Sequence, residues 1–220
     1  MVNRSQMAEL QQVFLRQRGR MRCVISIVLL MLAVSSSFAQ APLLMNGEQS
    51  ISFQFVGAFG DGDEAGGFGL SIASNSGFES GASVTMIDRP RDNVLGLSLS
   101  AAYYPFRSSV DTAGVSALAL YTGINSTTDN STPMSYLLGG GLILGSARHR
   151  PVSVVFGSSV IYAANDQRAE DRVFFVLEMA LNFRADAAII SIGPSVSTGD
   201  EETVYGVGFS VGLLSKRTEY

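Results

Sequence analysis

The sequence predicts an all-β protein: an antiparallel up-and-down barrel of about ten strands, with eight as the alternative count, that crosses a membrane. Three observations predict it. Apolar residues recur at every second position in segment after segment of the chain. The positions between them carry small residues rather than charged ones. Only 15% of all residues are charged, against roughly 25% in soluble domains.

The alternation is clearest over residues 205–213, where every odd position is large and apolar and every even position is Gly or Ser. Successive strand side chains point to opposite faces, so this period of two is typical of a strand with one apolar face. Ten segments show the alternation, the last three less regularly: 51–55, 67–72, 83–86, 95–103, 175–183, 190–193, 205–213, 115–124, 134–145 and 152–162.

The second face of these strands favours a membrane over water. A soluble barrel would carry Thr, Lys, Glu or Gln there, but this face is mostly Gly, Ser and Ala, which suits a narrow lumen. Within the strands Glu178 is the exception, and Arg172 and Arg184 fall at strand ends. The apolar face is therefore expected to face lipid, and strands near ten residues match a tilted membrane crossing of about 9–11 residues.

The ends of the predicted strands carry aromatic residues, a proline and connectors that bear on the membrane-barrel prediction. Aromatic residues expected at the membrane interfaces lie near them: Tyr103, Tyr104, Phe106, Tyr162, Phe183 and Tyr205. Pro194 falls inside a predicted strand and marks either a bulge or the end of that span. Residues 60–67 are predicted to form a flexible acidic loop, and long and short connectors are predicted to alternate, which gives the barrel one long-loop end.

Residues 1–41 are predicted to be a leader with a cleavable signal peptide, and residues 42–220 a single barrel domain. The apolar run 23–34 follows four arginines and precedes small residues that allow cleavage after Ala39 or Ala41. The run is too short for a membrane anchor helix. Met21 is the expected translation start, because the leader counted from there has ordinary proportions. A precursor that begins at Met1 would contradict this.

Removing the leader excludes several classes of function. It takes five arginines and one glutamate, so residues 42–220 keep 10 basic and 18 acidic residues, a net charge of −8. Nucleic acid is then a poor partner, because its binding needs clustered Lys and Arg. The only cysteine, Cys23, leaves with the leader, so neither a disulfide nor a thiolate site is expected in the mature chain.

The sequence offers few candidates for chemistry, so no catalytic residue and no cofactor are predicted. The single histidine, His149, lies in a basic turn and is interpreted as a surface residue. Asp61, Asp63 and Glu64 are weak candidates for a Ca²⁺ site, with a solvated acidic loop as the better interpretation. Gln54, Glu178 and Asn182 form a possible polar cluster in the lumen. Ordinary lumen packing, with Arg172 or Arg184 as partner, is the favoured alternative.

A family resemblance rests on residues 97–107, Leu-Ser-Leu-Ser-Ala-Ala-Tyr-Tyr-Pro-Phe-Arg, followed by a connector and another strand. This run resembles hairpins of small, porin-like outer-membrane β-barrel proteins of bacteria. The resemblance implies a Gram-negative-type outer membrane, both chain termini in the periplasm, and outer-membrane lipid and the barrel-insertion machinery as partners. Tyr220 matches the terminal aromatic residue of such families. Either the last strand ends near Leu214 with a tail, or this terminal signal is degenerate.

Three functional hypotheses follow. The first is a non-enzymatic outer-membrane barrel that serves as a narrow pore for an unidentified solute, a ligand or adhesion surface, or an envelope-structural element. The second is a soluble secreted or periplasmic barrel that binds a lipophilic ligand, which requires Phe and Leu to point inward. The third, an outer-membrane enzyme, lacks a recognisable catalytic set.

Overall fold

The computed structural model describes residues 41–45, 47–60, 63–88, 93–107, 114–128, 134–146, 149–165, 171–199 and 203–216. A short 3-10 turn, η1, spans Ala41–Leu43. Ten strands follow: β1 (Glu48–Gly60), β2 (Asp63–Ser74), β3 (Phe78–Asp88), β4 (Val94–Arg107), β5 (Val115–Thr127), β6 (Met134–Gly145), β7 (Val152–Asn165), β8 (Arg172–Arg184), β9 (Ala188–Thr198) and β10 (Thr203–Lys216).

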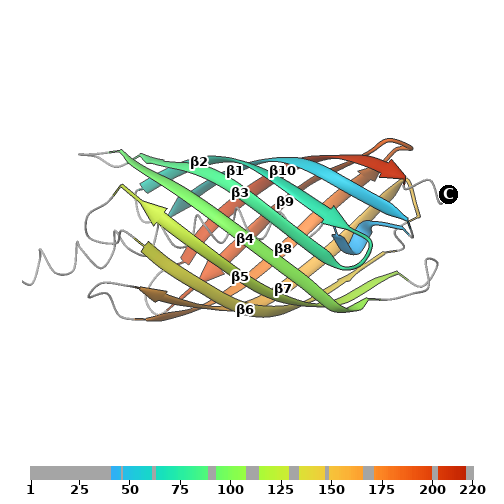
Figure 1. The fold of residues 1–220 in the computed structure, drawn as a ribbon. Coiled ribbons are helices and arrows are strands. Elements are labelled where there is room, and N and C mark those ends of the chain that lie inside the picture. Colours follow the sequence, from blue (N-terminus) through green and yellow to red (C-terminus); the bar gives the residue numbers. More distant parts are fainter. Residues whose placement is uncertain are drawn as a thin grey trace, which may run out of the picture.

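The strands close into one antiparallel barrel in which each strand pairs with its sequence neighbours and β1 pairs with β10 (Figure 1). This confirms the predicted fold class and the count of ten. Because the number of strands is even, β1 begins and β10 ends at the same end, which we call the terminal end. The turn η1 lies there too (Figure 1, right).

The strand register fixes the size of the barrel. Followed from partner to partner around the sheet, the register leaves β7 at Ser153 and returns to it at Asn165, twelve residues further along. Ten strands with this stagger, spaced about 4.8 Å apart with a rise of about 3.3 Å per residue, give a tilt of about 40° and a backbone radius of about 10 Å. The small inward side chains therefore surround a true lumen.

The two faces of the sheet separate as the alternation predicts. Large apolar side chains are exposed on the outside of every strand, with Leu99 63% and Leu138 65% exposed. Small and polar residues are buried inside, together with valines and with Ile87, Ile143, Ile161 and Ile189. The soluble alternative required inward Phe and Leu. On the described strands Phe174, Leu137 and the partly buried Leu214 point inward, whereas the other Phe and Leu side chains point outward.

One predicted interfacial aromatic residue is on the wrong side. Tyr103, Phe106, Tyr162, Phe183 and Tyr205 are exposed on the outer face, as expected. Tyr104 is buried in the lumen, because it follows Tyr103 directly on β4 and neighbouring strand residues point to opposite faces. The outward pair Pro105 and Phe106 then sits at a register shift between β4 and β5, so the alternation slips by one residue there.

The prediction of one long-loop end is wrong. The two ends carry similar connectors: 61–62, 89–93, 128–133, 166–171 and 199–202 at the far end, and 75–77, 108–114, 146–151 and 185–187 at the terminal end. The strands extend further than the alternation shows, because Gly, Ala and acidic residues continue the ladder at the rims. The predicted acidic loop 60–67 is mostly strand, with Ala65, Gly66 and Gly67 paired to β1.

Pro194 does not end its strand. β9 continues to Thr198, and Pro194 pairs with Val207 of β10. On the other side, the pairing of β9 with β8 is interrupted at Gly193 and Pro194 and resumes in the same register at Ser195. The proline thus marks a gap in one ladder rather than a bulge, consistent with its missing N–H.

Three earlier expectations fall outside the described residues: the signal peptide with its Met21 start, the side chain of Asp61, and Tyr220. β10 runs to Lys216, two residues beyond the expected end near Leu214. Among the described residues, no helix combines the length and apolarity that crossing a membrane would require.

Candidate functional site

Residues 41–45, here called the strap, lie in the mouth of the terminal end. Ala41, Leu43 and Leu44 are almost fully buried. Three lumen side chains hold the strap backbone: Glu79 accepts the Ala41 N–H at 3.2 Å, Arg107 donates to the Ala41 carbonyl at 3.2 Å, and Arg184 donates to the Leu43 carbonyl at 3.0 Å. With cleavage after Ala39, the strap is therefore bound from β3, β4 and β8 at once. With cleavage after Ala41, the bond from Arg184 of β8 to Leu43 remains.

An ion pair completes the attachment. Arg184 contacts Glu48 at 2.5 Å, with side chains 12% and 4% exposed. Glu48 also accepts the Met45 N–H at 2.8 Å. Glu48 begins β1 and Arg184 ends β8, so the ion pair joins these two strands at the mouth of the terminal end. Since the charges are paired and hydrogen-bonded, their burial is tolerated.

A chain of hydrogen bonds leads from the strap into the middle of the lumen. Gln54 Nε2 donates to the Ser71 hydroxyl at 3.1 Å, and Ser71 donates to Glu79 Oε1 at 3.3 Å. The other carboxylate oxygen of Glu79 holds the strap. One wall of the lumen, formed by β1, β2 and β3, is thus linked physically to the segment in its mouth.

Two larger side chains lie flat against the opposite part of the wall. A Cβ placed on Gly157 would lie 2.5 Å from Glu178 Oε1, and one placed on Gly141 would lie 2.6 Å from the Tyr121 hydroxyl. Each side chain therefore lies across a glycine of a nearby strand. Without these glycines, Glu178 and Tyr121 would have to project towards the barrel axis.

The most polar feature of the lumen follows the strand register. A single line of inward positions, here called the polar track, carries only hydroxyl and amide side chains apart from Gly69. From β7 it passes through Ser153, Asn182, Ser191, Ser210 and Gln54. It continues through Gly69, Ser83, Ser98 and Asn125 to Ser135 on β6, the last position of the track. Because each register step climbs the barrel, the track spirals from the terminal end to the far end.

Several polar atoms on and beside the track are buried without a hydrogen-bond partner. They are the hydroxyls of Ser50, Ser52 and Ser197 and the Asn182 side-chain oxygen. The amide nitrogen of Asn182 makes only a long contact of 3.4 Å to the Ala180 carbonyl. Buried polar groups are nearly always satisfied by protein or water. These acceptors and hydroxyls are therefore positions where water or a polar solute is expected.

The structure places the predicted lumen residues inside the barrel. Gln54 and Asn182 lie on the polar track, and Glu178 lies across Gly157. Of the two arginines suggested as partners of Glu178, Arg184 instead pairs with Glu48. That these three residues work as one cluster stays a prediction.

Of the weak metal candidates, the structure describes the side chain of Glu64 but not those of Asp61 and Asp63, so the Ca²⁺ site stays a prediction. Glu64 is exposed on the outer face at the far end, where it pairs in register with Asp88, which is also exposed. Both line a hollow of about 480 Å³ whose floor includes Gly57 and Gly66. In the described part of the chain, no three His, Cys, Asp or Glu side chains are grouped to hold a metal ion. His149 is exposed in a turn, as interpreted.

Sequence reasoning missed Glu79, Glu48 and Tyr121. Glu79 is 1% exposed, yet the alternation that marked its strand began only at Ser83, because Ser80, Gly81 and Ala82 do not alternate in size. The alternation of side chains along a strand indicates its position: Phe78 is outward, so its neighbour Glu79 must face the lumen. No local pattern marked the strap, whose hydrogen bonds to Glu79, Arg107 and Arg184 join residues distant in sequence.

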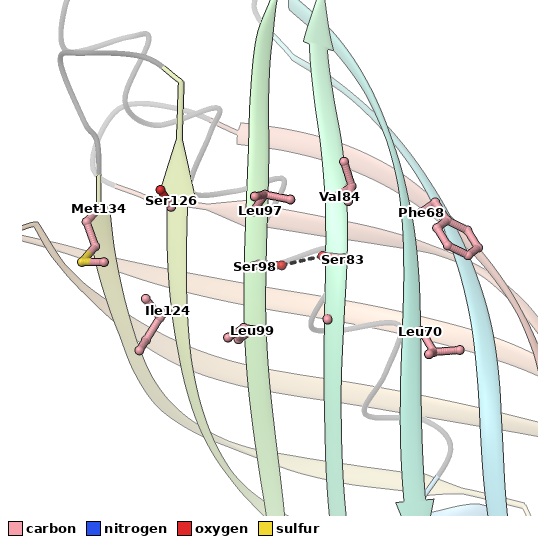
Figure 2. Close-up of a pocket in the computed structure, with 11 residues that line it drawn as sticks. Phe68, Leu70, Ser83, Val84, Leu97, Ser98, Leu99, Ile124, Ser126 and Met134 are labelled. Atoms are coloured by element: carbon pink, nitrogen blue, oxygen red, sulfur yellow. Dashed lines mark hydrogen bonds between the residues drawn. The ribbon is translucent and has the colours of Figure 1, made fainter.

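The outer face has a marked groove of about 470 Å³ over β2 to β6 (Figure 2). Ala82 lies between the larger Leu70 and Leu99 in the register, so the surface is hollowed there. Phe68, Val84, Leu97, Ile124 and Met134 complete its walls. The hydroxyls of Ser83 and Ser98, 2.5 Å apart, join β3 and β4 beneath it (Figure 2). An apolar groove in an apolar belt is what lipid chains would cover, so it belongs to the membrane-facing surface.

Comparisons with known proteins give structural likenesses alone. No protein-family model matches the sequence. No curated protein matches it either. In structure, the chain is similar to the KdgM porin, with 13% identity, 72% of this chain and 97% of that chain covered, and a TM-score of 0.41. It is also similar to the translocator domain of the autotransporter NalP from Neisseria meningitidis (12% identity, 89% and 98% covered, TM-score 0.45) and to Ail, the attachment invasion locus protein of Yersinia pestis (13%, 78% and 100%, TM-score 0.31).

The closed sheet and its two faces define the class without these likenesses. A soluble protein rarely exposes more than a few hundred Å² of contiguous apolar surface, whereas here the exposed apolar side chains surround the whole barrel. The molecule is a membrane-spanning β-barrel of the outer-membrane type.

Proposed function

We propose that this protein is a non-enzymatic barrel of the bacterial outer membrane whose lumen is a narrow passage for small polar solutes. The observation that carries the proposal is the division of one sheet into an apolar outside and a hydroxyl-, amide- and glycine-rich inside. A bilayer suits the first surface, and an aqueous lumen suits the second.

The outer-membrane location is supported by the architecture. A closed barrel leaves no unpaired strand edge in lipid. An exported chain with such a barrel would be delivered to the insertion machinery and assembled among outer-membrane lipids, as the leader and the apolar belt suggest.

Passage is favoured over an adhesion or ligand surface because the connectors at both ends are short. Binding surfaces of barrels need projecting loops, and the connector ranges leave little chain for them. The lumen, by contrast, holds the polar track and the strap. The strap narrows the passage at the terminal end, and its displacement is the step we expect to control flow.

The test combines fractionation with conductance. The full chain, expressed with its leader, is expected in the outer-membrane fraction after carbonate washing, with heat-modifiable mobility on gels. Purified protein in planar bilayers is expected to conduct weakly, and a variant with Arg107→Gln and Arg184→Gln, which loosens the strap, to conduct more. A freely soluble periplasmic pool would overturn the location. Absence of conductance in both proteins would overturn passage and favour an envelope-structural element.

A further inference from the structure

The polar track contains no ionisable side chain. Its members are serines, asparagines and one glutamine, although acidic and basic residues occur elsewhere in the lumen at Glu79, Glu178, Arg107 and Arg184. A charged solute on the track would lose its hydration without gaining a counter-charge. The chemistry of the track therefore favours an uncharged partner.

The hydrogen-bonding groups of the track offer both donors and acceptors. An amide supplies an N–H₂ and a carbonyl oxygen, and a hydroxyl can act either way. Asn182 and the nearby Ser50 and Ser52 contribute buried polar atoms that have no partner, and these lie within two strands of Ser210 on β10. The terminal third of the track is thus a built surface with unused hydrogen-bonding capacity.

The next inward line towards the far end carries Gly193, Gly208, Gly67 and Gly96, with Val56 between Gly208 and Gly67 and Thr85 between Gly67 and Gly96. The track thus has small neighbours on several strands. One full turn of the register climbs about 30 Å, the twelve-residue stagger at a rise of about 3.3 Å projected on the barrel axis, which is close to the thickness of a membrane core.

We infer that the polar track binds and guides an uncharged polyhydroxylated solute, a sugar or polyol, along the lumen. The inference rests on the proposed passage and names its substrate class. Hydroxyl groups of such a solute can exchange hydrogen bonds with successive track residues. The solute then moves in short steps and keeps hydrogen-bond partners along the way. Successive track residues lie on neighbouring strands about 4.8 Å apart, which keeps a new partner within reach.

The test measures the rate at which solutes enter liposomes that contain the barrel after removal of its leader. The probes are sucrose, polyethylene glycol of matched hydrodynamic radius, and the gluconate anion. Sucrose is expected to enter about tenfold faster than either of the others, the ratio that one or two additional hydrogen bonds in the passage would give. The same preparation is also assayed for sucrose binding in detergent by calorimetry.

Two variants make the result specific. Asn125→Leu and Asn182→Leu, combined, keep the side-chain shape on the track but remove its hydrogen bonds, and are expected to remove the preference for sucrose. Ser126→Leu with Ser158→Leu adds the same side chains at outward positions of β5 and β7 and is expected to leave it intact. Heat-modifiable mobility confirms that each variant is folded. If the Asn variant does not fold, Ser191→Ala with Ser210→Ala provides the same test with smaller side-chain changes.

The outcomes separate the two proposals. Entry of sucrose and polyethylene glycol at equal rates in all folded variants would overturn the track and leave passage standing. Sucrose binding without entry would overturn passage and support the track as a binding site. Neither entry nor binding would overturn both.

Discussion

The outer face and the lumen wall are made by the same ten strands, yet the outer face suits lipid and the lumen wall suits water. On β4, Leu95, Leu97 and Leu99 are exposed outside, while Gly96 and Ser98 face inward between them. The two faces differ by a shift of one residue. The comparison teaches that each strand specifies two environments, and that a substitution has opposite consequences according to the parity of its position.

The largest effect is expected where the lumen wall holds the strap. Arg184→Ala leaves Glu48 buried without its partner and releases the Leu43 carbonyl. Removing one member of a buried ion pair costs about 3–5 kcal/mol, so the strap is expected to leave the mouth. The measurement uses Leu43→Cys, since Cys23 in the leader is the only natural cysteine. Labelling by a soluble maleimide should be much faster in the Arg184→Ala background.

A control for this experiment lies outside the mouth. Ser76→Cys, in the exposed turn between β2 and β3 at the terminal end, should react at the same rate with and without Arg184→Ala. Equal protection of Leu43→Cys in both backgrounds would show that the apolar contacts of the strap, rather than its polar ones, hold it in place.

The next effect compares the two faces directly. Leu99→Arg places a charge on the lipid side of β4 and is expected to lower the free energy of unfolding from lipid vesicles by about 2–4 kcal/mol. Ser98→Arg, one residue away but in the lumen, should cost clearly less, because water and lumen carboxylates are within reach. Urea titrations monitored by gel mobility measure both. Equal losses would contradict the assignment of the faces.

A smaller effect is expected at the glycines under the lumen side chains. Gly157→Val would place a Cβ 2.5 Å from Glu178 Oε1 and force that side chain towards the barrel axis. Such overpacking costs about 1–3 kcal/mol, and the lumen becomes narrower, so conductance should fall. Gly57→Val is the matched control on the outer face, where a Cβ meets nothing within 4 Å. A fall in conductance with the control alone would contradict the interpretation.

The smallest effect concerns the outer face at its far rim. Phe59 and Tyr205 stack with ring centroids 5.9 Å apart across the β1–β10 closure. A double-mutant cycle with Phe59→Leu and Tyr205→Leu is expected to give a coupling of about 0.5–1.5 kcal/mol. A coupling of zero in vesicles would mean that lipid replaces the ring contact without loss.

Much of the fold could be predicted because alternation is a local signal. The segments 95–103 and 205–213 marked β4 and β10, and the contrast of Leu with Gly and Ser assigned their faces. The strand ends were less predictable, since Glu64 falls in the predicted acidic loop 60–67 and yet extends β2. An acidic residue at the rim of a membrane barrel is compatible with a loop and with a strand. Only pairing with the neighbouring strand decides between the two.

The candidate site was predictable only in part. Gln54, Glu178 and Asn182 could be assigned to the lumen because their parity is that of the small residues around them. The hydrogen bonds of Glu79 to Ser71 and to the strap could not be predicted. They join residues that are 8 and 38 positions apart, and nothing local brings them together.

The sequence by itself determined the strands, their two faces and the kind of surroundings each face needs, because side-chain alternation and composition are properties of single segments. Only the tertiary structure decided the strand register. That register fixes the radius of the barrel, aligns nine separate polar residues into one spiral, and sets Arg184 beside Glu48. It depends on how ten strands close on one another, and the free energy of that closure is shared among all of them.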